Sequence, residues 1–549
     1  TELSNLTNTF IISINEQGYS HLFAYSPFNS RPIRLTNGQW DDISPSYNHD
    51  GSKIVFASNR NAYWDIYTLN LLDGKISRIT DTPDFDGNPK WSPDDKWIAF
   101  DTFDGEQTKI NIISPSNLKI SVTLTDGKSL DFQPEWSPSG RQIAFVSNRS
   151  GKNSIWIANL DKPLAERFSL LSTDSQGIDS HPAWSPDGSM IAWGSHQSGE
   201  PDSIVVWKNK PSGQEPKKLM AGDYPVWNQN GSEISAIISD PNQDYLASFT
   251  LDGVFTMPLI PLNGVQGMDL HLTTAASFFD IFSSKAKITP TQKWKSNESG
   301  AEYIKGQKVP LGLLPDVDAP NPYLQDKVIS SFLSLRKQVM LKTGWDALGS
   351  LESAYTPISS VLDPGRRNDW LYTGRAFSIN PLTMNAGWMV VTKEEFSGRT
   401  YWRVYLKAVA QDGSEGEPLH NFPWDLNNRY SLDPTAYDQG GSQGKAIPSG
   451  YWVDFTKMAL DFGWQRLPAH DNWRTFFKGT NFNQFVKTDG LDWKSAMLEI
   501  YPVDIFITPT IVIPPTPTAT ATPKGYHYQT PTPTRTVTPT RRPTNTHVP

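Results

Sequence analysis

The chain has 549 residues, including 20 tryptophans and no cysteine, and its formal net charge is −8. Without cysteine the protein has no disulfide bond, thiol nucleophile or cysteine-ligated zinc, and its acidic balance argues against a nucleic-acid partner. No apolar run of about 18 residues occurs, so the sequence predicts no membrane-spanning helix. Because the first residue is Thr1 rather than methionine, we expect an export signal or an anchor to precede it.

The first half of the chain repeats one short phrase, in which a proline opens an extended segment and an aromatic residue follows two positions later. The aromatic anchors recur every 43 to 48 residues, at Tyr47, Trp91, Trp136, Trp184 and Trp227. After them comes a tight turn such as Ser-Pro-Asp-Gly, in which Pro186 presets φ and Gly188 accepts a positive φ. This period is typical of one four-stranded propeller blade.

An incomplete unit precedes the first full repeat. Residues 9–14, 21–25 and 32–36 are predicted to be the second, third and fourth strands of a blade whose first strand is missing. Because a propeller closes its ring by borrowing a strand from the far end, we expect residues 268–273 to supply it. The sequence therefore predicts six blades within residues 1–285.

The phrases PKWSPDDKWIAF, PEWSPSGRQIAFVSNRSGKNSIWIANLD and PAWSPDGSMIAWGS resemble the WD-like repeats of TolB-type six-bladed propellers. The resemblance covers about the first half of the chain. Propellers of this type include binding proteins, periplasmic scaffolds and the substrate gates of peptidases. The resemblance therefore implies the fold, and it leaves the function open.

An aspartate stands two or three residues before the proline of each repeat, at Asp42, Asp86, Asp131, Asp179 and Asp223. Residues just before the innermost strands ring the mouth of the central channel, so five carboxylates there would attract a cation, a basic side chain or a free amino terminus. His181 belongs to the same candidate site, because it precedes Pro182 as other polar residues precede the other prolines. The alternative is that each aspartate hydrogen-bonds backbone amides of its own loop.

The sequence pattern changes after the predicted propeller. Residues 286–308 are a predicted linker, and residues 309–505 alternate helix and strand signals as an α+β domain. Val328, Phe332, Leu335 and Val339 have helical spacing with Gly344 as a stop signal. Strands are expected at 388–392 and 402–406, and helices at 453–462 and 493–500, the last with Asp492 as its N-cap. The predicted fold class is thus mainly β: a propeller, a smaller α+β domain and a tail.

Parts of this domain resemble the D-alanyl-D-alanine carboxypeptidase family of zinc peptidases, in the segments Thr343-Gly344-Trp345, Ser353-Ala354-Tyr355 and residues 372–379. In that family the last segment reads His-x-x-Gly-x-Ala-x-Asp, and its His and Asp bind zinc. Aligned on Gly374 and Ala376, the ligand positions hold Leu371 and Ser378, neither of which binds zinc at useful affinity. The resemblance therefore implies a scaffold that has lost its metal, and no cofactor is predicted.

A serine hydrolase is the alternative enzyme class, because Gly440-Gly441-Ser442-Gln443-Gly444 matches the nucleophile-elbow pattern. The elbow needs a buried strand before the serine and a helix after it, and the flanking residues here are polar. Histidines later in the chain are His470, His527 and His547. A glycine loop is the simpler interpretation.

Eight tryptophans of the second domain exceed what its core should need, and exposed indoles suit sugar rings. From residue 506 to 549 the chain is rich in Thr and Pro, which predicts an extended, disordered stalk of an exported protein. We therefore expect a cell-surface or envelope binding and scaffold protein, whose propeller binds an envelope protein and whose second domain holds wall peptide or glycan. The rival is an extracellular peptidase or other hydrolase.

Overall fold

The computed structural model describes residues 6–27, 32–172, 177–197, 200, 202–208, 216–274, 280–282, 293, 308–360 and 368–506. The chain divides into one compact unit that ends at Tyr501 and a second unit that begins at Pro502. Of the second unit, only residues 502–506 are described, and they contain the 3₁₀ turn η8 (Val503–Phe506). The expected stalk therefore lies outside the described residues, apart from its first residue.

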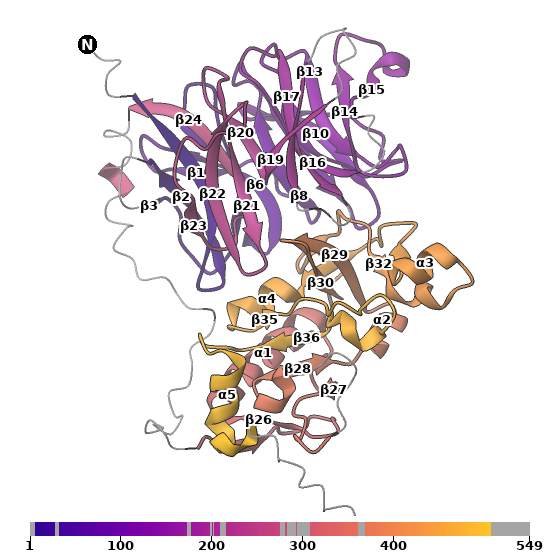
Figure 1. Ribbon diagram of the computed structural model, residues 1–549. Coiled ribbons are helices and arrows are strands. Elements are labelled where there is room, and N and C mark those ends of the chain that lie inside the picture. Colours follow the sequence, from indigo (N-terminus) through magenta and orange to yellow (C-terminus); the bar gives the residue numbers. More distant parts are fainter. Residues whose placement is uncertain are drawn as a thin grey trace, which may run out of the picture. The chain divides into compact units, whose positions relative to one another are not determined.

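Six four-stranded antiparallel sheets form the blades, drawn from indigo to magenta in Figure 1. The first five full blades in chain order are β4 (Asp42–Tyr47) to β7 (Ile76–Arg78), β8 (Phe85–Trp91) to β11 (Asn117–Thr123), β12 (Asp131–Trp136) to β15 (Phe168–Leu170), β16 (Gly177–Trp184) to β19 (Lys217–Ala221), and β20 (Asp223–Trp227) to β23 (Ile260–Leu262). The strands between these are β5 (Lys53–Asn61), β6 (Tyr63–Asn70), β9 (Ile98–Phe103), β10 (Thr108–Ser114), β13 (Gln142–Ser147), β14 (Ser154–Asn159), β17 (Met190–Gln197), β18 (Ser203–Lys208), β21 (Glu233–Asp240) and β22 (Gln243–Thr250).

The sixth blade closes the ring as predicted. Its strands are β24 (Met268–Thr274), β1 (Leu6–Glu16), β2 (Tyr19–Tyr25) and β3 (Ile33–Arg34), in that order. β24 pairs antiparallel with β1, from Leu6 opposite Thr274 to Ile12 opposite Met268. The expected closing strand is confirmed, and it joins the two ends of the propeller without a covalent link.

The second region, orange to yellow in Figure 1, is α+β. One sheet has the order β27 (Leu351–Ser353), β28 (Ala376–Ile379), β36 (Gln484–Val486) and β35 (Gln465–Arg466). The other has the order β29 (Met389–Phe396), β30 (Arg399–Lys407), β34 (Tyr451–Asp454) and β31 (Glu417–Pro418). Two small sheets pair β25 (Leu311–Leu313) with β26 (Tyr323–Gln325), and β32 (Trp424–Asp425) with β33 (Ser442–Gln443).

The helices of this region are α1 (Asp326–Thr343), α2 (Leu382–Asn385), α3 (Pro434–Gln439), α4 (Phe455–Asp461) and α5 (Trp493–Ile500). The four residues of the predicted apolar stripe are buried on α1, and Gly344 ends it with φ 70°. Asp492 caps α5 by accepting the backbone N–H of Ser495 at 2.6 Å. None of the helices among the described residues combines the length and apolar character that a bilayer crossing requires.

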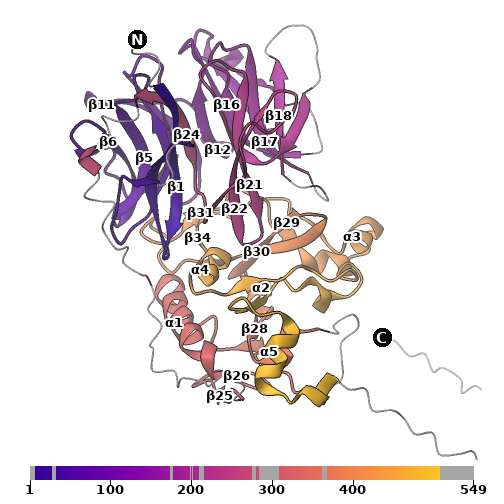
Figure 2. The same cartoon turned by 60° about the vertical axis from the view of Figure 1, so that its left-hand side comes forward.

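The propeller and the α+β region share a hydrophobic core. Phe103 of β9 and Tyr451 of β34 belong to one buried cluster, with their ring centroids 5.2 Å apart. The Tyr451 hydroxyl also donates to the Phe103 carbonyl at 3.0 Å. Figure 2 shows β31 and β34 beside the blades, as these contacts require. The boundaries of the predicted linker stay predictions, because 294–307 lie outside the described residues.

Candidate functional site

Each of the five repeats carries a bulge in its innermost strand. The register of β4, β8, β12, β16 and β20 shifts at the repeat proline and the residue before it. The residue before that proline has a positive φ between 46° and 54° at Ser44, Asn88, Gln133, His181 and Tyr224. A positive φ is costly for residues other than glycine, and bulges re-aim side chains beside functional sites. These five polar residues, rather than the aspartates, line the central channel.

Four of the five predicted mouth aspartates are buried and have partners inside their own blade. Asp42 pairs with Arg60 and Asp131 with Arg149, at 2.6 and 2.7 Å. Asp86 accepts from the Thr102 hydroxyl at 2.7 Å, and Asp179 accepts from the Ser195 hydroxyl at 2.9 Å. All four are at most 4% exposed. The partners of these four aspartates lie within the same blade, as the alternative interpretation of the sequence predicted. They are side chains, however, whereas that interpretation predicted backbone amides of the loop.

Asp223 differs from the other four because it reaches His181 of the neighbouring blade. Its carboxylate accepts from His181 Nδ1 at 2.9 Å and from the Ser180 hydroxyl at 3.0 Å. Burial opposes ionisation, but the hydrogen bonds from His181, Ser180 and the Tyr224 backbone N–H lower the pKa of Asp223 below its usual value. The His181 ring stacks on Tyr224 with centroids 3.8 Å apart. Asp223 is therefore an anion held by a neighbouring blade.

The protonation state of His181 follows from its contacts. The His181 backbone N–H donates to Gln133 Oε1 at 2.9 Å, so the Gln133 amide nitrogen faces His181 Nε2, 2.7 Å away. An amide nitrogen only donates, so Nε2 is the unprotonated nitrogen and Nδ1 carries the proton given to Asp223. His181 is neutral in this arrangement, and the charge of Asp223 is not cancelled by it.

The α+β region covers this mouth of the propeller. Lys457 donates to Gln266 Oε1 at 2.7 Å, and Asn153 donates to the His420 backbone carbonyl at 2.7 Å. The His420 ring stacks on Phe132 with centroids 4.5 Å apart. Burial lowers the pKa of His420 to about 4, so it is neutral at pH 7. The α+β region of the same chain therefore covers the face at which the sequence predicted a partner.

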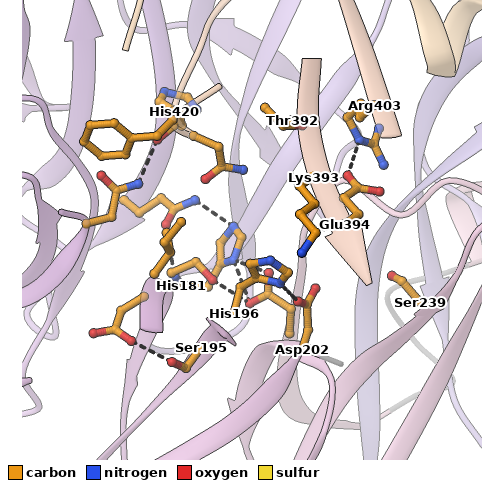
Figure 3. Close-up of a pocket in the computed structure, with 18 of the residues that line it drawn as sticks. His181, Ser195, His196, Asp202, Ser239, Thr392, Lys393, Glu394, Arg403 and His420 are labelled. Atoms are coloured by element: carbon orange, nitrogen blue, oxygen red, sulfur yellow. Dashed lines mark hydrogen bonds and ion pairs between the residues drawn. The ribbon is translucent and has the colours of Figure 1, made fainter. Parts of the chain in front are cut away.

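A cavity of about 400 Å³ remains between the propeller and the hairpin β29–β30. Asp179, His181, His196, Asp202 and Asp223 line it from the propeller, and Lys393, Glu394, Arg403 and His420 from the other side. In Figure 3, Lys393 points toward His196, whereas Glu394 turns to Arg403. His196 Nδ1 bonds Asp202 at 2.6 Å, and although burial opposes it, this contact raises the pKa of His196. Sequence reasoning singled out three lining residues and missed those of the hairpin.

A second cavity, of about 390 Å³, lies within the α+β region. Its lining includes Asp369, Trp370, Arg399, His470 and Gln484. It adjoins the two former ligand positions, since Leu371 follows Trp370 in the 3₁₀ turn η5 (Trp370–Thr373) and Ser378 pairs with Gln484 across strands. The cavity combines acidic, basic and aromatic side chains.

The former ligand positions themselves are internal. Leu371 packs with Ala376 and Val486 in a small apolar cluster, and Ser378 is buried in β28. Within the described ranges no group of three or more His, Asp or Glu side chains is arranged to hold a metal ion.

Ser442 does not lie in an elbow. The order around it is helix α3, Gly440 as the C-cap with φ 70°, and then the two-residue strand β33, whereas an elbow runs from strand to helix. Its hydroxyl accepts from Asn428 Nδ2 at 2.6 Å. His470 lines the second cavity, which Ser442 does not line, and His527 and His547 lie outside the described residues.

Residues 3–129 and 87–259 match the model of the TolB beta propeller domain. The N-terminal half of the chain is therefore a TolB-like β-propeller, as the repeats predicted. Curated relatives include the Tol-Pal system protein TolB of Francisella tularensis subsp. mediasiatica, 40% identical over 121 residues, and that of subsp. holarctica, 38% identical over 118 residues. Each alignment covers 22% of this chain and 27% of the relative, so the chain matches about a quarter of their length.

Solved structures with a similar fold include TolB from Acinetobacter baumannii, with 20% identity and a TM-score of 0.43 over 48% of this chain and 66% of that one. A putative TolB from Agrobacterium tumefaciens has 18% identity and a TM-score of 0.34 over 48% of this chain and 98% of that one.

Proposed function

We propose that the protein is an exported, envelope-associated binding and scaffold protein. Its propeller binds an envelope protein, and its α+β region holds wall peptide or glycan without cleaving it. The role of the propeller is carried over from relatives that are named for the Tol-Pal system. The alignment covers about a quarter of the length of those relatives. Of the predicted site, Asp179, His181 and Asp223 remain binding candidates, because they line the cavity at the propeller mouth.

The observation that carries the wall-binding half is the 390 Å³ cavity beside Leu371 and Ser378. Arg399 and His470 on its wall suit the carboxylate of a peptide end, and Asp369 and Asp471 suit an amino group. Trp370 adds an aromatic face for an apolar side chain or a sugar ring. Because the ligand positions of the resembled family hold Leu and Ser, we propose binding without zinc-dependent cleavage. Of the second-domain tryptophans, Trp402, Trp452, Trp464 and Trp473 are buried, which favours a core role for them.

The test is a calorimetric titration of the full chain with a wall peptide that ends in D-alanyl-D-alanine. We expect binding without release of D-alanine, and about tenfold weaker binding for Arg399→Ala, because a charge-assisted hydrogen bond to the carboxylate is lost. Arg474→Ala is the matched control, since Arg474 is an exposed arginine of the same region that does not line the cavity.

A parallel capture experiment uses the purified chain against the cell envelope of its source. Retention of envelope protein supports the scaffold role, and retention of wall fragments supports the second domain's role. Release of D-alanine or a stoichiometric metal would instead identify a working peptidase. Failure of both retention and peptide binding would overturn the proposal.

A further inference from the structure

The cavity at the propeller mouth is too small for a folded partner. Its volume of about 400 Å³ falls within the roughly 300–1,000 Å³ of small-molecule pockets. Hairpin β29–β30 and the segment from His420 to Phe422 form one of its walls, and both belong to the same compact unit as the blades. Its occupant is therefore a small molecule or the end of a chain.

The charges on the two walls are unequal. On the hairpin wall, Glu394 is paired with both Arg403 and Arg466, and Arg403 is also paired with Asp454. Lys393 is paired with Glu395 at 2.9 Å, so three cations and three anions balance there. On the propeller wall, Asp223 faces a neutral His181, and Asp179 accepts from the neutral Ser195 hydroxyl and Trp193 indole. The propeller wall therefore carries uncompensated negative charge.

A buried acceptor on the same wall has no partner. The Asn153 side-chain amide donates its nitrogen to the His420 carbonyl, which orients its oxygen, Oδ1, the other way. Asn153 is 1% exposed and lines the cavity, and within the described residues Oδ1 accepts no hydrogen bond. A buried amide oxygen without a donor is destabilising, so this wall favours a ligand that donates hydrogen bonds.

We propose that this cavity binds a small organic ligand through a primary ammonium group, whose N–H bonds go to the Asp223 carboxylate, with Asn153 Oδ1 accepting from the ligand as well. The inference rests on the proposed function in treating the propeller mouth as a binding site, and it adds the ligand class. An ammonium group has three donors and a positive charge, which match the acceptors and charge of this wall. The ligand touches both regions and so holds them together.

The test is a titration of the full chain with n-pentylamine, and with n-pentanol and pentanoate as neutral and anionic probes of the same length. We expect binding of the amine and a raised Tm, weaker or no binding of the alcohol, and none of the carboxylate. A Gly-Lys-Gly tripeptide and Nα-blocked Gly-Lys-Gly-amide distinguish a free α-amino group from a lysine side chain as the source. Equal affinity for amine and alcohol, or a preference for pentanoate, would overturn the inference.

Single substitutions test which side chains of the cavity bind the amine. Asp223→Asn should weaken amine binding about tenfold or more, because a partly buried charge pair is lost. Asp86→Asn is the matched control, since Asp86 occupies the same place in its repeat, is buried and does not line the cavity. Should Asp223→Asn fail to fold, Asn153→Ala serves, because it removes the second acceptor that the proposal assigns to the ligand. Unchanged amine affinity in a folded Asp223→Asn protein, or in Asn153→Ala when it stands in, would overturn the assignment.

The two proposals fail separately. Envelope retention without amine binding overturns this inference alone, and amine binding without retention or wall-peptide binding overturns the proposed function alone.

Discussion

Asp86 shows how one repeat position acquires different chemistry in different blades. Asp42 and Asp131 have arginine partners, whereas the donors to Asp86 include the hydroxyls of Thr102 and Thr82. Burial raises the pKa of Asp86 to about 7, and the hydroxyls offset only part of that effect. The buried carboxyl is therefore half protonated near neutral pH.

This pKa predicts a pH-dependent effect of Asp86→Asn. A carboxyl whose folded pKa lies above its unfolded value binds an extra proton in the folded state, so its contribution to stability falls as pH rises from about 4 to about 7. Asparagine does not ionise, so its contribution to stability does not fall as pH rises. The free energy of unfolding of the variant, relative to wild type, should rise by up to about 4 kcal/mol between pH 4 and pH 8.

Thermal unfolding of both proteins at pH 4, 6 and 8 measures that change. Asp252→Asn, at an exposed turn of the propeller, is the control and should show no such trend. A difference between Asp86→Asn and wild type that does not vary with pH would contradict the assignment of the raised pKa to burial.

At the scale of elements, closure of the ring depends on a glycine just before β24. Gly267 has φ 113°, and its carbonyl accepts the Ser13 N–H at 3.0 Å. A methyl group on Gly267 would lie 2.7 Å from the Cα of Ser44 in the first full blade. The other atoms nearby are the Ser44 nitrogen and the Pro45 ring, so no flexible side chain can move away.

Gly267→Ala should therefore destabilise the protein by about 2–4 kcal/mol, the sum of a strained φ and a backbone clash. Urea unfolding measures the loss, and limited proteolysis should cut near β24 sooner than in wild type. Gly151→Ala isolates the conformational part, because Gly151 has φ 93° and no atom within 4 Å of an added methyl; about 1 kcal/mol is expected. Equal losses for the two variants would show that the clash is relieved.

At the scale of the whole molecule, the second region is a cover for the propeller mouth. The contacts that hold it join distant parts of the chain: Tyr451 with Phe103, Asn153 with His420, and Arg466 with the Pro241 carbonyl. Tyr451 is 1% exposed, and it belongs to a hydrophobic cluster with residues from both regions. The propeller and its cover should therefore unfold together.

Tyr451→Ala should separate the two unfolding steps. Removing a buried aromatic ring costs about 3–5 kcal/mol, and the cost falls on the junction. Calorimetry should show two transitions in place of one. Tyr451→Phe keeps the ring, loses only the hydrogen bond to Phe103 and should retain a single transition about 1 kcal/mol less stable. Two transitions already in the wild-type protein would contradict the shared core.

The elements that the sequence predicted correctly rest on local patterns. The blade period, the stripe on α1, Gly344 and the Asp492 cap all depend on residues a few positions apart, whose spacing sets the backbone geometry directly. The closing strand 268–273 was also predictable, because an incomplete blade at one end requires a strand from the other. The polar residues on both sides of Ser442 already favour a glycine loop over a nucleophile elbow, and the structure has no elbow there.

The candidate site was only partly predictable. The repeats located Asp179, His181 and Asp223 in sequence, but a conserved place in the repeat does not reveal a partner. Arg60 and Arg149 neutralise Asp42 and Asp131, which are 18 residues away in sequence. The bulge that turns the residue before each proline into the channel has a φ that sequence patterns do not disclose.

By itself, the sequence determined the propeller, the number of its blades and its closure, because those follow from a period and from antiparallel pairing of neighbours. Tertiary structure alone decided that the α+β region covers the mouth and that a cavity remains there. That arrangement depends on contacts such as the one between Asn153 and His420, which lie 267 residues apart, and on the burial that they create. Burial and the charge left on each wall are properties of the packed molecule, so no stretch of sequence carries them.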